Sequence, residues 1–188
     1  MSNMIRNKSK VSRVMASVSA ACAVAVFAQL AVAAPTNEDD PRSQAKRMYD
    51  RIAGVPADDA TLTLMAADIT GGSKLNAALR ATDAPEFYSV TLKNFVTPWT
   101  NRDQSVFAPL NDYTATVIGM VRDDKPFNTA LSADILYTSN APGLAAPSAG
   151  NNDHYAQAET QGVNLKATLV ETTQSAVYGI PAAGTAGL

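Results

Sequence analysis

Apolar residues recur every three or four positions through much of the chain after residue 40, which is the spacing of one face of an α-helix. In the first such stretch the apolar positions are Ala45, Met48, Tyr49 and Ile52. Pro41 suits the first position of a helix, and Gly54 followed by Pro56 suits its end. The pattern therefore predicts a helix over residues 41–53.

The same spacing predicts four more helices, at residues 58–70, 73–82, 85–96 and 111–123. Asn111 is expected to cap the last of them, because its short polar side chain can accept a hydrogen bond from a free backbone N–H. Residues 97–111 and 139–153 are expected to be loops, since both carry two prolines and many polar or small residues.

The remaining elements are shorter. A brief helix is expected from residue 128 or 129 to 132, and an extended segment at 134–137. Residues 163–176 alternate weakly with a period of two, as a strand would, but a helix over 165–178 also fits and is the favoured interpretation. The fold class is therefore mainly α: an irregular helical domain of about five or six helices with long loops, following a cleaved signal peptide.

The expected organisation has five parts. These are a signal peptide at 1–33, a disordered leader at 34–40, a helical domain at 41–138, a flexible loop at 139–153 and a C-terminal segment at 154–188. Whether the last segment ends naturally or is truncated is left open, because its final residues are small and carry no stop signal.

The N-terminal region has the three parts of a secretory signal peptide. Its basic residues are Arg6, Lys8, Lys10 and Arg13. An uncharged apolar run over 14–34 follows, and Ala31-Val32-Ala33 offers the small residues that a signal peptidase requires, with cleavage before Ala34. We therefore expect a periplasmic or secreted protein. Two alternatives are an uncleaved anchor, which would keep the chain at the membrane, and a lipoprotein modified at Cys22.

Removal of the signal peptide changes the charge and the redox chemistry. Lys plus Arg falls from 15 to 11 while Asp plus Glu stays at 17, so the formal net charge changes from −2 to −6. Such an acidic domain is a poor partner for nucleic acid. The one cysteine, Cys22, leaves with the signal peptide, so the mature chain has no disulfide and no thiolate ligand.

No complete catalytic or metal-binding motif occurs in the sequence. His154 is the one histidine, and it is expected in a loop among polar neighbours, where a single imidazole and carboxylate are too few for zinc. The acidic pairs Asp58-Asp59 and Asp123-Asp124 are expected to be a helix cap and a solvated helix end. The sequence also lacks the G-x-S-x-G, phosphate-loop, dinucleotide and Cys-x-x-Cys-His motifs, so no catalytic residue, metal or cofactor is expected in this chain.

The segment from Trp99 to Gln104 is the strongest candidate binding loop. Trp99, Asn101, Arg102 and Asp103 place an aromatic ring, an amide, a guanidinium and a carboxylate in one short stretch. Loops with such groups often bind ligands, and His154 is added as a further candidate. The alternative is that Trp99 fills the helical core while Arg102 and Asp103 bond locally.

Four short stretches together resemble a family. They are V-R-D-D-K-P-F at 121–127, L-S-A-D-I-L-Y at 131–137, the dipeptide H-Y at 154–155, and the region 179–187. Their order resembles an N-terminal domain of unknown function in large secreted bacterial proteins related to cytochrome c, and the resemblance covers roughly residues 110–188. Ile135 departs from the tyrosine usual in that family, and the family's haem motifs would lie beyond residue 188.

Three functions follow, in order of preference. The resemblance implies an exported, non-catalytic helical domain that serves as a scaffold or docks an envelope protein or a redox domain. The second is a periplasmic module that binds a small molecule or glycan through the Trp99–Asp103 loop, since aromatic-plus-polar loops suit such ligands. The third is an enzyme with carboxylate chemistry, which would require Asp103 and a distant acid to converge in one cleft.

Overall fold

The computed structural model describes residues 40–180 of the chain. The predicted signal peptide, nearly all of the predicted leader and the last eight residues lie outside that range. The described part is mainly helical, with one small sheet, as the sequence predicts. Within it, no helix is long and apolar enough to cross a membrane.

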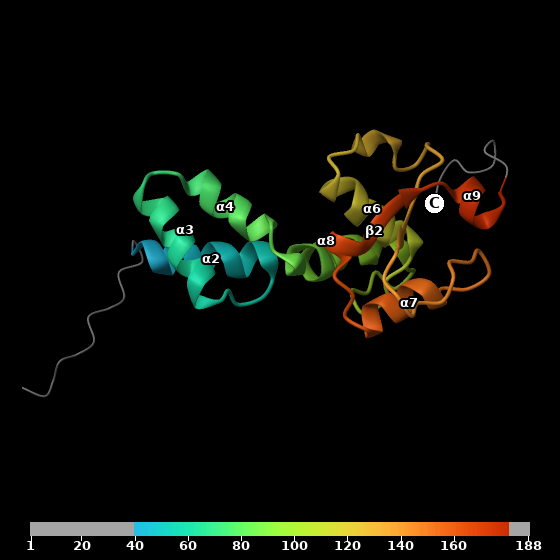
Figure 1. Ribbon diagram of the computed structural model, residues 1–188, viewed down its shortest axis with the longest axis horizontal. Coiled ribbons are helices and arrows are strands. Elements are labelled where there is room, and N and C mark those ends of the chain that lie inside the picture. Colours follow the sequence, from blue (N-terminus) through green and yellow to red (C-terminus); the bar gives the residue numbers. More distant parts are fainter. Residues whose placement is uncertain (1–39, 181–188) are drawn as a thin grey trace, which may run out of the picture. The chain divides into compact units, whose positions relative to one another are not determined.

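The first three helices agree with the sequence pattern. They are α2 (Pro41–Ala53), α3 (Asp59–Thr70) and α4 (Lys74–Thr82), and they pack together in the blue-to-green part of Figure 1. Asp58 caps α3, its carboxylate accepting the N–H of Thr61 at 2.7 Å, as the prediction of a helix cap requires. Alanines and a few larger apolar side chains form the core between these helices: Ala45, Tyr49, Ala53, Met65, Ile69, Ala77, Ala81 and Ala84.

The fourth predicted helix exists, but its form differs from the prediction. It starts as a π-helix, η1 (Phe87–Leu92), continues as the single α-turn α5 (Lys93–Val96), and tightens into the 3₁₀ turn η2 (Thr97–Thr100). Pro98 fits in that last turn because it lies among the first residues, where its missing N–H is not needed. The predicted loop therefore begins near residue 101, and Trp99 belongs to a helical turn.

The most buried helix is α6 (Asp112–Arg122). Asn111 caps it as predicted, accepting the N–H of Thr114 at 2.9 Å. Every residue from Thr114 to Met120 is buried, because α6 packs against the small sheet on one side and against other helices elsewhere. The second apolar core gathers around it, with Leu110, Ile118, Met120, Tyr137, Tyr155 and Leu169 among its members.

The sheet has two antiparallel strands, β1 (Leu136–Ser139) and β2 (Leu169–Thr172), paired from Leu136 with Thr172 to Ser139 with Leu169. The expected extended segment at 134–137 is thus present, shifted by two residues. The short 3₁₀ turn η3 (Phe127–Thr129) stands close to the expected brief helix. Strand β1 crosses the expected boundary at 138 and pairs with a strand from the C-terminal segment.

Two predictions for the C-terminal segment are wrong. The favoured helix over 165–178 is divided into α8 (Leu165–Thr168), β2 and α9 (Gln174–Tyr178), because Leu169–Thr172 pairs with β1 (Figure 1). Asn164 and Thr173 cap the two short helices through their side chains. His154, expected in a loop, lies instead in α7 (Asp153–Thr160).

Candidate functional site

A cleft of about 680 Å³ lies beside η2 and the start of α6. Its volume falls in the range of small-molecule sites, about 300–1,000 Å³. Segments distant in sequence converge on it: η2, α6, the 148–152 loop, α7 and α9. Its lining residues are Trp99, Thr100, Asn111, Asp112, Tyr113, Leu131, Ser148, Ala149, Gly150, Asn151, Asn152, Tyr155 and Tyr178.

Trp99 is the one predicted site residue that lines this cleft. Its side chain is 52 % exposed and packs edge-on against Phe95, with ring centroids 4.9 Å apart. The alternative interpretation, in which Trp99 fills the helical core, is therefore wrong. Its position on η2 leaves the indole partly in solvent, where it can contact a ligand.

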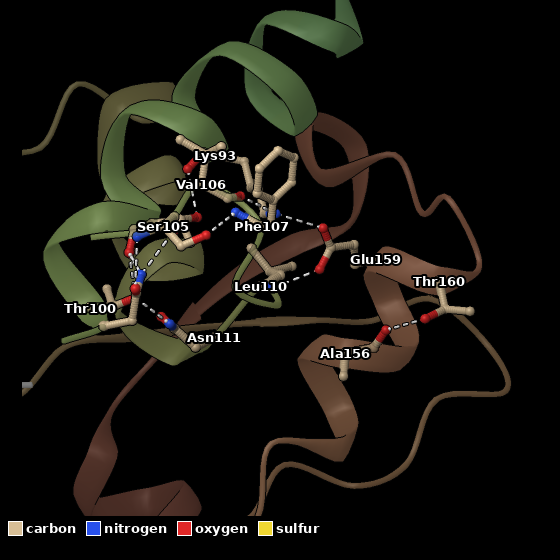
Figure 2. A network of polar contacts seen from close by, with 12 residues as sticks. Lys93, Thr100, Ser105, Val106, Phe107, Leu110, Asn111, Ala156, Glu159 and Thr160 are labelled. Carbon is tan, nitrogen blue, oxygen red and sulfur yellow. Dashed lines mark hydrogen bonds and ion pairs between the residues drawn. The ribbon is translucent and has the colours of Figure 1, made fainter. Parts of the chain in front are cut away.

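Asn101 does not line the cleft, and its side chain instead holds the backbone turn that follows η2. Its amide donates to the carbonyls of Thr97 and Ser105 at 2.8 and 2.9 Å, and its oxygen accepts the N–H of Ser105 at 2.8 Å. These bonds close the turn that follows η2. A further bond of 2.7 Å, from the Asn111 amide to the Thr100 hydroxyl, ties this turn to the start of α6 (Figure 2).

Arg102 and Asp103 are both exposed and do not line the cleft. Neither side chain forms a hydrogen bond or ion pair with another residue in the 40–180 range, so the expectation of local bonding finds no support there. The structure thus separates the predicted loop into an indole at the cleft, an amide that holds the turn, and two charges in solvent.

His154 is also removed from the cleft lining. It is 3 % exposed, its Nε2 accepts the N–H of Ser139 at 3.0 Å, and its Nδ1 lies 2.7 Å from the Ala145 carbonyl. A neutral ring that carries its proton on Nδ1 satisfies both contacts. Both nitrogens are therefore engaged in joining α7 to β1 and to the 140s loop.

Asp112 is the charged side chain of the cleft. It is the first residue of α6, where a carboxylate interacts favourably with the helix dipole. One oxygen accepts the N–H of Tyr113 at 2.8 Å, and the other lies 3.4 Å from the hydroxyl of Tyr178. No basic residue among those described forms an ion pair with it.

Two tyrosines connect Asp112 to the core. Tyr155 is 3 % exposed and donates its hydroxyl to the Tyr137 carbonyl at 3.2 Å. Burial raises the pKa of Tyr155, and hydrogen bonding with Tyr178 raises it further. Burial also raises the pKa of Tyr178, with the negative charge of Asp112 adding to the effect. Both phenols are therefore protonated near neutral pH and present O–H groups rather than charge.

A second polar network, shown in Figure 2, holds the loop between η2 and α6. The buried Lys93 ammonium forms an ion pair of 2.8 Å with Glu159 and donates to the Val106 carbonyl at 3.2 Å. The other oxygen of Glu159 accepts the N–H of Leu110 at 2.7 Å. These contacts join α5, the loop and α7.

Asp123 and Asp124 are exposed at the end of α6, as predicted, but Asp123 also takes part in the hydrogen bonding of the fold. Asp123 receives two hydrogen bonds from Arg122, at 2.7 and 2.8 Å, and one of 2.8 Å from the Tyr137 hydroxyl. Arg122 also donates to the carbonyls of Lys166 and Leu169. Among residues 40–180, no group of three or more His, Cys, Asp or Glu side chains is arranged to hold a metal ion.

The cleft residues other than Trp99 were not predicted from the sequence. Asp112, Tyr113, Tyr155 and Tyr178 come from three helices, and only tertiary packing brings them together. Three of the six tyrosines of the chain line the cleft, but nothing in the sequence distinguishes these three from the others. Comparisons with protein-family models, curated proteins and solved structures found no match to the chain.

Proposed function

We propose that the domain is a non-catalytic module that binds a small uncharged or cationic molecule in the cleft beside Trp99. The observation that carries this proposal is the composition of the lining: aromatic rings and amides surround a single carboxylate, and none of the described lining residues is basic. Aromatic faces with a few polar groups suit a sugar or an organic cation. Anionic ligands, such as phosphates and carboxylic acids, would meet the Asp112 charge without compensation.

The acid content of the lining supports this proposal over a catalytic one. The carboxylate chemistry considered for Asp103 requires a second acid facing it, whereas Asp103 lies outside the cleft and Asp112 is the one acid in the lining. A pair of carboxyls acting on a glycosidic bond lies about 5–9 Å apart across the substrate. With one acid, the cleft is suited to binding.

Calorimetric titration with maltose, choline and succinate tests the proposal. We expect maltose or choline to bind and succinate not to bind. Trp99→Ala should weaken the observed binding by about tenfold or more, because an aromatic contact is lost from the site. Phe107→Ala is the matched control, since Phe107 is also an exposed aromatic residue, at 90 %, and does not line the cleft. Binding of succinate alone, binding unaffected by Trp99→Ala, or no binding of any probe contradicts the proposal.

A second candidate is the exported docking unit implied by the resemblance to cytochrome-c-related proteins. It is favoured by two exposed aromatic side chains: Phe95, which packs against Trp99, is 60 % exposed, and Phe107 is 90 % exposed. Apolar groups gathered on a surface often mark a protein interface. We further propose that the chain is exported to the periplasm or beyond, on the strength of the residues before Ala34.

Intact mass and a visible spectrum of protein recovered from the cell envelope test this second candidate. A mass starting at Ala34, together with recovery alongside a haem protein that is lost in Phe107→Ala, would support it. Recovery from the cytoplasm with residue 1 or 2 at the N-terminus would contradict the export, and recovery without a partner would contradict the docking.

A further inference from the structure

We infer that the ligand of this cleft is a small organic cation carrying an alkylated ammonium group, held by Asp112 against the rings of Trp99, Tyr113 and Tyr178. This inference rests on the proposed function, because it names the ligand class for the same cleft. It goes further in stating that the Asp112 carboxylate makes the ionic contact with the positive charge of the ligand.

The electrostatics of the cleft favour a cation. Asp112 provides the one formal charge of the described lining, and no basic side chain of the described residues forms an ion pair with it. Its two hydrogen bonds come from a backbone N–H at 2.8 Å and a phenol at 3.4 Å, the second of which is long. An ionised carboxylate can accept about four hydrogen bonds or contacts, so capacity remains for a ligand.

The aromatic side chains favour an alkylated ammonium over a bare one. Trp99, Tyr113 and Tyr178 are partly exposed where they line the cleft, and Tyr155, which also lines it, is buried and donates its hydroxyl to the Tyr137 carbonyl. A cation within about 6 Å of such a ring is attracted by its negative face. Methyl groups on the nitrogen also bury apolar area against the rings, and they lower the cost of removing the cation from water.

The protonation of the tyrosines is consistent with this assignment. Burial raises the pKa of Tyr178, so its hydroxyl stays neutral and does not add a second charge to the cleft. The amides of Asn151 and Asn152 also line the cleft as neutral groups, although Asn151 already accepts the Asp153 N–H at 3.0 Å and Asn152 donates to the Leu110 carbonyl at 2.7 Å. A hydroxyl or carbonyl elsewhere on the ligand can therefore be bound without a second ionic contact.

A pair of isosteres tests the inference directly. Choline and 3,3-dimethylbutan-1-ol have the same shape, and they differ by a positive nitrogen in place of a carbon. We expect choline to bind the protein at least about tenfold more tightly by calorimetry, and the difference to shrink as salt is added, because the attraction is ionic.

Asp112→Asn should remove most of that preference. Asp153→Asn is the matched control, because Asp153 is also the first residue of a helix but is exposed and does not line the cleft. It should leave the ratio of the two affinities unchanged. If Asp112→Asn does not fold, the salt dependence of choline binding to the unaltered protein decides the question.

The outcomes separate this inference from the proposed function. Equal binding of the two isosteres, or binding of maltose but not of choline, overturns the cation while leaving a ligand-binding cleft. No binding of choline, the alcohol or maltose overturns both. A preference for choline that survives Asp112→Asn overturns the role of the carboxylate.

Discussion

Gly119, in the middle of α6, lies directly beside the Tyr137 ring of β1. A Cβ built there would stand 2.1 Å from Cδ1 of Tyr137, whose side chain is fully buried in β1. The absence of a side chain at residue 119 therefore lets the ring lie flat against the helix backbone. The phenol extends beyond it to reach Asp123 at 2.8 Å.

Gly119→Ala is expected to destabilise the fold strongly. The added methyl group cannot fit unless the buried ring or the helix moves, and such overpacking costs on the order of 1–3 kcal/mol or more. Urea unfolding followed by circular dichroism measures the loss. Gly71→Ala is the control, because its φ is −75° and its Cβ would meet only an ordinary contact at 3.4 Å. Equal stability of the two variants would contradict the close packing.

Asp123 gives the fold a dependence on pH. Hydrogen bonds from Arg122 hold the pKa of the Asp123 carboxyl below its ordinary value. A carboxyl whose pKa is lowered by folding stabilises the folded state fully at pH values above its pKa in the unfolded chain, which is about 4. This stabilisation disappears as the pH falls through the lower pKa of the folded state.

Asp123→Asn should therefore cost on the order of 1 kcal/mol of unfolding free energy at neutral pH and less near pH 3. Urea titrations at the two pH values measure the difference. Asp103→Asn is the control, because that carboxylate is exposed and forms no ion pair within the described range. A loss for Asp123→Asn that is as large at pH 3 as at pH 7 would exclude the linkage.

At the scale of elements, the secondary structure follows the local sequence where spacing, caps and breakers agree. It differs where a segment pairs with a distant part of the chain. The helices at 41–53, 58–70, 73–82 and 111–123 could be predicted, because spacing, caps and breakers agree there. The C-terminal helix could not be excluded from the sequence, since Leu169–Thr172 becomes a strand only by pairing with β1. The spacing of apolar residues did not indicate that η1 is a π-helix rather than an α-helix.

The Lys93–Glu159 pair determines how α5 and α7 are held. The Lys93 side chain is 10 % exposed and the Glu159 side chain 40 %, so part of the interaction is screened by water. A double-mutant cycle with Lys93→Met and Glu159→Gln should give a coupling of about 1 kcal/mol. The pair Lys46–Asp50 on α2, whose lysine side chain is 58 % exposed, should give about 0.5 kcal/mol or less when it is replaced in the same way. Equal couplings would show that burial adds nothing to the α5–α7 contact.

At the scale of the whole molecule, the described part has two apolar cores. One belongs to α2, α3 and α4, and the other surrounds α6 and the sheet. Lys166 of α8 joins them through an ion pair with Asp83 and a 2.6 Å bond to its carbonyl. The cleft lies among elements that contribute to the second core.

The mainly helical class could be predicted from periodicity, but the site could not. Trp99 was found because an aromatic ring in a polar stretch is visible in the sequence. Arg102 and Asp103 are equally conspicuous in the sequence, but they are not among the residues that line the cleft. Asp112 was not singled out, because a carboxylate in the first turn of a helix is usually a dipole partner, and its place beside Tyr178 depends on contacts across 66 residues.

A ¹H–¹⁵N correlation spectrum of the protein, recorded during titration with choline and, separately, with maltose, would show where a ligand binds. We expect saturable shifts for at least one of them, centred on the amides of Trp99, Asp112, Gly150 and Tyr178, and little change in α2, α3 and α4. Shifts that do not saturate, or that gather on the three-helix region instead, would contradict a binding site in the cleft.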